Sequence, residues 1–359
     1  MKKIVFKIIC MCCCIATLAS CTNSNILKTK DITTALTQTN VIIEPEINTA
    51  EQYELFNKSF ISDFTVPGLF EGVIPQGICY DGLSKAFIIS GYYEDGIFPS
   101  VLMVVDAKSG TLKSYHPLKN IDNSDYFGHA GGIASSDDYI FITSDSCCYT
   151  ISTAQLTKAK DNQPVSFEAC FKLNTKGSFA GFDNGILWVG DFIESSDGER
   201  KNVERVTTLD SGETLYAYCE GYILKDGLPD VKKINSFANG YIPDYMLAIP
   251  EQVQGIAFTD NGKIIFSTSY GRKNDSYLYI YDDVLISERA GTVTVDKTEI
   301  DLLACSSEFL YKKITLPPMA EGITEGIDGF YLLFESGAEK YRNHRGKYPV
   351  DTVYKTDFE

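Results

Sequence analysis

Short runs that alternate apolar with small or polar residues recur along the chain, and the clearest copy lies at residues 251–272. Gln254 to Phe258 alternates with the period of a half-buried strand, and Lys263 to Thr268 returns as a strongly apolar strand. Between them, Asp260-Asn261-Gly262 supplies residues that tolerate positive φ and allow the chain to reverse. This stretch therefore predicts a β-hairpin.

Four more copies of the hairpin pattern occur, each built around one glycine. The repeated glycines are separated by 55, 49, 74 and 67 residues; they are Gly77, Gly132, Gly181, Gly255 and Gly322. Several short strands per unit at this spacing are typical of a β-propeller, and a glycine at one fixed place would let crowded inner strands approach each other. We predict an all-β fold, a β-propeller with five blades. An antiparallel sandwich is the alternative fold, and a sixth blade within the 74-residue interval is the alternative blade count.

The two ends of the repeat region predict how the ring closes. Lys58 to Phe64 reads as a strand before the first unit, and Asp351 to Phe358 reads as a strand after the last hairpin. The last blade then lacks its outermost strand, which the N-terminal run can supply. Closure of this kind removes an exposed sheet edge. Within the fourth unit, Ile300 to Cys305 is interpreted as a short helix.

The first twenty residues have the pattern of an export signal. Lys2, Lys3 and Lys7 precede an apolar run that is too short for a normal membrane span. The run ends in Leu18-Ala19-Ser20-Cys21, which resembles the lipobox of bacterial lipoproteins. The resemblance implies cleavage before Cys21 and lipid attachment to its thiol; an ordinary signal peptide cut nearby is the alternative. The predicted organisation is a signal peptide at 1–20, a flexible tether at 21–51 and a propeller domain at 52–359.

The charge of the chain narrows the choice of partners. The formal net charge is −16, and removal of the signal lysines makes it more negative. An acidic surface repels phosphate backbones, so we expect no nucleic acid partner. We expect a monomer anchored in the lipid bilayer through acylated Cys21, on the extracytoplasmic face of the cell membrane, whose ligand is a small molecule, a glycan or a protein.

Six cysteines remain after Cys21. An even number outside the cytoplasm permits disulfides, but a domain of this size can bury a large core without them. Cys79 and Cys170 fall within apolar strand patterns, where a free thiol acts as a small apolar side chain. The sequence favours free, buried cysteines and leaves the disulfide state of all six open; they are Cys79, Cys147, Cys148, Cys170, Cys219 and Cys305.

The candidate site is the mouth of the central channel, where loops from all blades meet on a rigid scaffold. Its predicted residues lie just before the repeated glycines or on loops that leave the second strands; they are Gln76, His129, Asp191, Gln252, Gln254, Tyr270, Arg272, Glu321, Glu335 and Arg342. Together with Arg345, the two arginines suggest capture of an anionic group.

The chemistry at this mouth stays open between binding and catalysis. Glu321-Gly322 resembles the metal-ligand Glu-Gly of gluconolactonase-like propellers, but the Asn and Asp ligands of that family cannot be placed in this sequence. We therefore predict no metal and no cofactor. The interpretation we favour is ligand binding without turnover. The alternative is a hydrolase or lactonase, with or without a metal, or a glycosidase that uses carboxylates among Asp183, Asp191, Glu321 and Glu335.

Overall fold

The structure is a computed structural model that describes residues 35–41, 50–194, 206–230, 233–235, 240–343 and 346–358 of the 359-residue chain. All of these residues belong to one compact unit, Ile32–Glu359. The predicted signal peptide, Cys21 and most of the predicted tether lie outside the described residues, as do His344 and Arg345. In the described part of the chain, no helix is long and apolar enough to cross a membrane.

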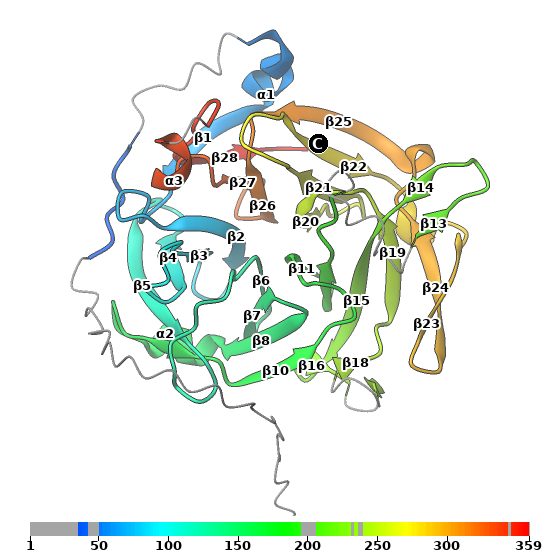
Figure 1. The fold of residues 1–359 in the computed structure, drawn as a ribbon, viewed down its shortest axis with the longest axis horizontal. Coiled ribbons are helices and arrows are strands. Elements are labelled where there is room, and N and C mark those ends of the chain that lie inside the picture. The colour runs from blue at the N-terminus through cyan, green and yellow to red at the C-terminus, as the bar shows by residue number, and fades with distance from the viewer. Residues whose placement is uncertain are drawn as a thin grey trace, which may run out of the picture. The chain divides into compact units, whose positions relative to one another are not determined.

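The described residues form five mostly antiparallel sheets of four or more strands arranged around a centre (Figure 1), which confirms the predicted propeller. The first blade comprises β2 (Ile74–Asp81), β3 (Ala86–Tyr92), β4 (Val101–Asp106), β5 (Leu112–Lys119) and, parallel to β5, the short β9 (Val165–Ser166). The second comprises β6 (Gly132–Ser135), β7 (Tyr139–Ser144), β8 (Cys147–Ser152) and β10 (Ala169–Lys172), extended by β18 (Gly240–Tyr241) and β17 (Ile234–Asn235).

The third blade is the widest. Its strands are β11 (Phe179–Asp183), β12 (Ile186–Gly190), β15 (Ala217–Lys225) and β19 (Tyr245–Ile249), extended by β24 (Thr298–Ala304) and β23 (Gly291–Val295); β16 (Leu228–Pro229) pairs with β15. A separate hairpin is formed by β13 (Thr207–Thr208) and β14 (Thr214–Leu215). Of these additions, β13, β14 and β16 lie in the 74-residue interval, whose described residues form no further blade, whereas β23 and β24 come from the interval that follows.

The fourth blade comprises β20 (Val253–Phe258), β21 (Ile264–Thr268), β22 (Ser276–Tyr281) and β25 (Leu310–Leu316). The fifth comprises β26 (Ala320–Glu325), β27 (Phe330–Phe334), β28 (Thr352–Thr356) and β1 (Phe60–Thr65). Because β1 pairs antiparallel with β28, the first described strand completes the last blade. The predicted closure of the ring is therefore confirmed.

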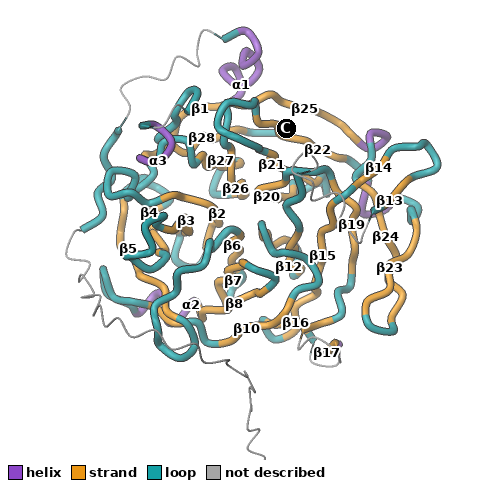
Figure 2. Tube along the Cα trace, viewed as in Figure 1, coloured by secondary structure: helices purple, strands orange, loops and turns teal. Residues whose placement is uncertain are grey.

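Helices are few and lie toward the outside of the ring (Figure 2). They are α1 (Glu54–Ser59), α2 (Thr153–Lys158), α3 (Glu339–Arg342) and the 3-10 turns η2 (Glu51–Tyr53), η6 (Val284–Ile286) and η7 (Ser307–Phe309). The helix predicted at Ile300 to Cys305 is wrong, because most of these residues belong to the strand β24. Ile300, Leu302 and Ala304 are buried while Asp301 is exposed, which is the period of a strand.

The repeated glycines mark the places where the inner strands crowd together. The inner strands contact one another in the cyclic order β2, β6, β11, β20, β26 and back to β2. A Cβ atom on Gly322 would lie 2.7 Å from the backbone nitrogen of Ile78, and one on Gly255 would lie 2.8 Å from that of Ile323. These distances leave no room for a side chain, as the sequence predicted.

The hydrophobic core is divided among the spaces between neighbouring blades. One cluster packs the third blade against the fourth and includes Trp188 and Phe266, both almost fully buried. A corresponding cluster lies at each of the other four blade interfaces, so the strands are apolar on both faces and the core has no single centre.

Two expectations about individual segments need correction. Residues 35–41, which fall in the predicted tether, pack on the propeller. Leu36 is buried, and Gln38 donates a hydrogen bond to Thr65 O (2.8 Å) and accepts one from Leu112 N (2.7 Å). The six described cysteines are free thiols, and Cys170 is exposed because it lies at an outer strand, where one face of the sheet meets solvent.

Candidate functional site

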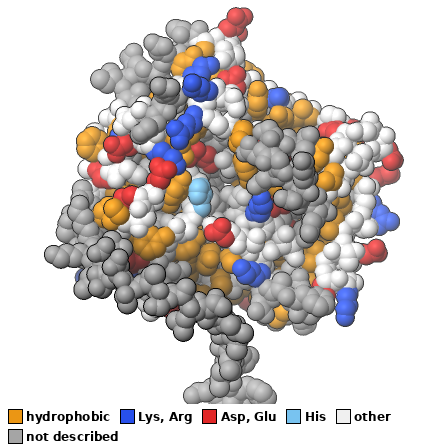
Figure 3. Space-filling model, viewed as in Figure 1, with side chains coloured by type: hydrophobic (Ala, Val, Ile, Leu, Met, Phe, Trp, Pro, Cys, Tyr) orange, Lys and Arg blue, Asp and Glu red, His pale blue; other side chains and the backbone are white. Residues whose placement is uncertain are grey.

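A cavity of about 640 Å³ opens at the end of the channel where the inner strands begin. In β2, β6 and β20, the residue immediately before the repeated glycine lines this cavity; these residues are Gln76, Gly131 and Gln254. The rest of the lining comes from the ends of β7 and β12 and from the loop before β11. On the face shown in Figure 3, acidic, basic and histidine side chains lie near the centre of the ring.

Two buried carboxyl groups contact the side chains of Gln76 and Gln254. Glu321, on β26, is 3% exposed, and its carboxyl group hydrogen-bonds to that of Glu335, which directly follows β27. The β26–β27 hairpin has an irregular register between Ala320 and Ile323, and Glu321 lies in this irregular segment. A hydrogen bond between two carboxyl groups requires a proton on one of them, so the pair shares a proton.

Burial controls the titration of this pair. Burial raises the pKa of Glu321 well above its ordinary value, and the neighbouring Glu335 raises it further. Burial raises the pKa of Glu335 to about 7, opposed by hydrogen bonds from Tyr341 and Gln76 and by the charge of Lys340. The pair therefore keeps at least one proton near neutral pH, which is the behaviour expected when two carboxyl groups are too close for both to ionise.

The carboxyl pair orients the two glutamines. Gln76 Nε2 donates to Glu335 Oε2 (3.1 Å) and Gln254 Nε2 donates to Glu321 Oε1 (3.2 Å). These bonds connect the first and fourth blades to the fifth. Among the described residues, neither glutamine uses its carbonyl oxygen Oε1 in a hydrogen bond with another protein group. The cavity is thus bordered by two amide groups in fixed orientation whose acceptor oxygens are available.

Tyrosines enclose the pair on the side of α3. Tyr341 hydrogen-bonds to Glu335, and Tyr92 in turn hydrogen-bonds to Tyr341. The guanidinium of Arg272 and the ammonium of Lys340 lie 5.0 and 5.2 Å from the centre of the Tyr341 ring. Both distances are within the range of a cation–π contact. Lys340 also forms a salt bridge with Glu94 (2.9 Å), so both cations contact Tyr341 beside the carboxyl pair.

The opposite wall of the cavity comes from the second and third blades. Asp145 and Ser146 both adopt left-handed backbone conformations, with φ of 52° and 58°. The side chain of Thr143 is fully buried and lines the cavity, and its hydroxyl has no hydrogen-bond partner among the described atoms. A buried hydroxyl without a partner is destabilising, so Thr143 is a point in the cavity wall where the hydrogen bonding within the protein is incomplete.

An aromatic edge borders the mouth. His129 stacks on Tyr92 with ring centres 4.3 Å apart. The surrounding loops partly desolvate this histidine and lower its pKa, although the ring keeps access to solvent. Phe192 lines the cavity, and Tyr270 lies beside it with ring centres 6.5 Å apart.

Most of the predicted site residues thus lie in or around the cavity. Gln76, Gln254 and His129 line it, Glu321 and Glu335 stand behind the glutamines, and Tyr270 lies at the rim. Asp191 also lies at this end, where it accepts a hydrogen bond from the backbone of Lys176 (2.5 Å) and fixes the loop before β11.

Three predicted site residues contact other protein groups and do not line the cavity. Arg342 donates to the carbonyl oxygens of Leu69 (3.0 Å) and Gly337 (2.9 Å), so it ties loops together. Arg272 lies against Tyr341, and Gln252 donates to Glu194 outside the cavity. These two arginines thus contact carbonyl groups and a tyrosine ring, and because Arg345 lies outside the described residues, the anion-binding arginine cluster stays a prediction.

Two residues of the site could not be found from local sequence patterns. Thr143 lies within an ordinary strand pattern, and Tyr341 lies in a short helix after the last hairpin, so neither shows a local signal. Among the described residues, no three His, Cys, Asp or Glu side chains are arranged to hold a metal ion. The described residues thus do not complete the ligand set that the Glu-Gly resemblance would imply.

Fold and cavity define the class of this protein, a five-bladed β-propeller with a polar cavity at the mouth of its channel. No family model matches the chain, and no curated protein matches it significantly. Among solved structures, it is similar to glutaminyl cyclase from Myxococcus xanthus, with 11% identity over 80% of this chain and 91% of that chain and a TM-score of 0.40. It is also similar to the PQQ-bound aldose sugar dehydrogenase from Streptomyces coelicolor, with 13% identity over 83% and 98% and a TM-score of 0.44. BamB from Moraxella catarrhalis aligns with 10% identity over 83% and 91% and a TM-score of 0.33. At these values no activity follows for this chain.

Proposed function

We propose that the protein is an extracytoplasmic binding protein, anchored to the membrane through acylated Cys21, that takes a small polar ligand into the cavity at the channel mouth. One observation carries the proposal: Gln76 and Gln254 are held by a buried pair of carboxyl groups and keep their acceptor oxygens available. Preorganised hydrogen-bonding groups of this kind lower the cost of ordering a site on binding.

The polar groups of the cavity define the ligand chemistry. The amide oxygens of Gln76 and Gln254 and the carboxylate of Asp145 accept hydrogen bonds, and the buried hydroxyl of Thr143 can accept or donate. A ligand that offers several N–H or O–H donors, such as an amine or a polyol, satisfies these groups. Phe192 provides an apolar surface beside them.

A matched pair of substitutions tests this proposal. Thr143→Val removes the cavity hydroxyl and keeps the shape of the side chain. Thr175→Val is its control, because Thr175 also has a buried hydroxyl without a described partner but does not line the cavity. Calorimetric titration with diamines, amino-acid amides and polyols should detect a wild-type ligand whose affinity falls roughly three- to tenfold in Thr143→Val only, the loss of about one hydrogen bond. If no compound binds, or if both variants bind equally well, the cavity assignment is wrong.

Hydrolysis is the second candidate, because two carboxyl groups with raised pKa that share a proton are typical of acid–base catalysis. A glycosidase needs its two carboxyl groups about 5 Å or more apart, whereas these are in direct hydrogen-bond contact. Lactones and activated esters are therefore the substrates to test. Turnover that is lost in Glu335→Gln while ligand binding remains would establish the hydrolase, and absence of turnover in wild type would favour the binding protein.

The anchor has its own test. Cys21→Ser should abolish membrane association, since the acyl chains provide the membrane affinity of a protein with one anchoring cysteine. The mature wild-type protein should partition with the membrane fraction and carry lipid by mass spectrometry. Soluble, lipid-free mature protein would contradict the lipoprotein proposal and leave the cavity proposal untouched.

A further inference from the structure

A second cavity lies between the third and fourth blades, separate from the channel. It has a volume of about 370 Å³, within the usual range for small-molecule sites. We call it the interblade cleft; it is lined by Tyr216, Glu251, Gln252, Thr268, Tyr277 and Tyr279. It shares no lining residue with the cavity at the channel mouth.

Its aromatic wall is built by the regular geometry of β22. Tyr277 and Tyr279 are two residues apart and so lie on one face of this strand, with ring centres 6.0 Å apart. Lys313, opposite Tyr279 on β25, places its ammonium 3.8 Å from the centre of the Tyr277 ring and 4.9 Å from that of Tyr279. This cation–π contact holds both rings in place. Both tyrosines are half-buried, and no described hydrogen bond uses their hydroxyl groups.

Gln252, a polar residue of the cleft lining, is also held in one conformation. Gln252 is not a glycine, yet it adopts a left-handed conformation with φ of 64°. Its backbone N–H donates to Ile193 O (3.0 Å), and its carbonyl oxygen accepts from Ser269 N (2.9 Å). Its amide Nε2 donates to Glu194, while no described hydrogen bond uses Oε1. A strained residue that the surrounding structure holds in place is a common feature of binding sites.

From this arrangement we infer that the interblade cleft binds a pyranose ring of a carbohydrate. The C–H faces of a sugar pack against tyrosine rings, while its hydroxyl groups bond to amide and carboxylate groups at the ring edge. The cleft combines these features, because Tyr277, Tyr279, Glu251 and Gln252 all line it. A purely aromatic ligand would contact the tyrosines but offer no hydroxyl groups to the amide and carboxylate groups of the cleft.

The experiment compares tyrosines inside and outside the cleft. Tyr277→Ala removes a stacking ring. Tyr311→Ala is the control, because Tyr311 lies on β25 of the same blade, is 63% exposed and does not line the cleft. Binding of glucose, galactose, N-acetylglucosamine, maltose, cellobiose and diacetylchitobiose is measured by saturation-transfer NMR and calorimetry. At least one sugar should bind wild type and the control equally, and bind Tyr277→Ala about three- to tenfold more weakly, as expected for one lost ring contact.

Two further variants keep the outcome unambiguous. Tyr277→Leu retains apolar volume in case Tyr277→Ala is poorly folded, and it should lose affinity while keeping its melting temperature. Thr143→Val, at the channel mouth, serves only to locate the sugar, because Thr143 does not line the interblade cleft. The inference is overturned if no sugar in the panel binds, if the Tyr277 variants bind normally, or if Thr143→Val alone loses binding, which would place the sugar in the channel mouth.

Discussion

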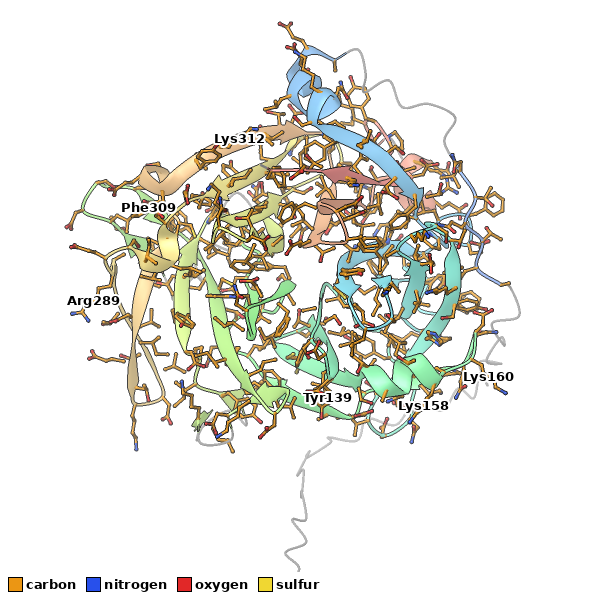
Figure 4. The ribbon with its side chains drawn as sticks, turned by 180° about the vertical axis from the view of Figure 1, so that it is seen from behind. Tyr139, Lys158, Lys160, Arg289, Phe309 and Lys312 are labelled. Atoms are coloured by element: carbon orange, nitrogen blue, oxygen red, sulfur yellow. The ribbon has the colours of Figure 1, made fainter. Side chains whose placement is uncertain are left out.

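The two ends of the central channel carry carboxyl groups in contrasting settings. At the mouth, Glu321 and Glu335 are held by Gln76, Gln254 and each other. At the far end, a second cavity of about 330 Å³ is lined by Asp183 and Glu325. Burial raises the pKa of both far-end groups, and the charge of Asp260 raises it further. In the view from behind, the labelled basic side chains Lys158, Lys160, Arg289 and Lys312 lie at the periphery of the ring (Figure 4).

The hydrogen bonding of the carboxyl groups distinguishes the two ends. At the mouth they form an organised site, whereas at the far end like charges are merely close together. The mouth carboxyl groups are buried and form hydrogen bonds with the two neighbouring blades, so removing one leaves unpaired groups behind. At the far end Glu325 is exposed, and its carboxylate interacts with its neighbours through solvent. A raised pKa alone does not mark a site; the hydrogen-bonded partners do.

The largest expected effect on stability comes from substituting a repeated glycine of the inner strands, which lie between the two ends of the channel. Gly322→Ala would place a Cβ 2.7 Å from Ile78 N, against backbone that cannot move away. We expect a loss of about 3 kcal/mol in the free energy of unfolding. Gly291→Ala is the control, because nothing lies within 4 Å of its added Cβ. Urea denaturation of both variants measures the difference, and equal stabilities would show that the inner strands are less crowded than described.

The second-largest effect is expected when one carboxyl group is removed from the mouth, and the same change at the far end should have a much smaller effect on stability. Glu321→Ala leaves Glu335 and Gln254 with unsatisfied buried groups, which should cost about 2 kcal/mol. Glu325→Ala removes an exposed group and should change stability by less than about 0.5 kcal/mol. Chemical denaturation at pH 7 gives both values. If both variants lose a similar free energy of unfolding, the carboxyl groups at the mouth are no better organised than those at the far end.

The pH dependence of stability sharpens the comparison. The folded state binds protons at this carboxyl pair more tightly than the unfolded chain does, because the pKa of Glu335 rises from 4.5 to about 7 on folding and that of Glu321 rises as well. The free energy of unfolding should therefore fall as pH rises from 4.5 to 7, by about 1–2 kcal/mol. Glu335→Gln should flatten this fall, and 0.5 M NaCl should not, since salt screens buried groups weakly. A wild-type profile that is flat over this range would contradict the shared proton.

The smallest effect is expected at the far end. Asp183→Asn removes one of the carboxylates that repel each other and keeps an oxygen to accept the hydrogen bond from Asn184. At low salt it should stabilise the fold by no more than about 0.5 kcal/mol, and the gain should vanish in 0.5 M NaCl. Thermal denaturation at both salt concentrations measures this. Destabilisation by more than that amount would mean that Asp183 has a structural partner.

The sequence alone determined the fold of the described chain to a large extent. Repeated glycines and paired strand patterns gave five units, and the unpaired strand patterns at the two ends of the repeat region gave the closure through β1 and β28. These features depend on local periodicity and on one steric requirement per unit, both of which are visible along the chain. The same reasoning placed Gln76, Gln254 and Glu321 at the channel, because each precedes a repeated glycine.

Only the tertiary structure decided which of these side chains act together. Gln76 and Glu335 are 259 residues apart and meet because the ring closes between the first and fifth blades. Arg342 and Gln252 were predicted at the mouth, but nearby carbonyl groups and Glu194 engage them instead. Thr143 became a site residue because its hydroxyl is buried beside the cavity without a partner. Hydrogen bonds between distant side chains depend on distances that no local pattern encodes, so periodicity could locate the channel but could not assign its contacts.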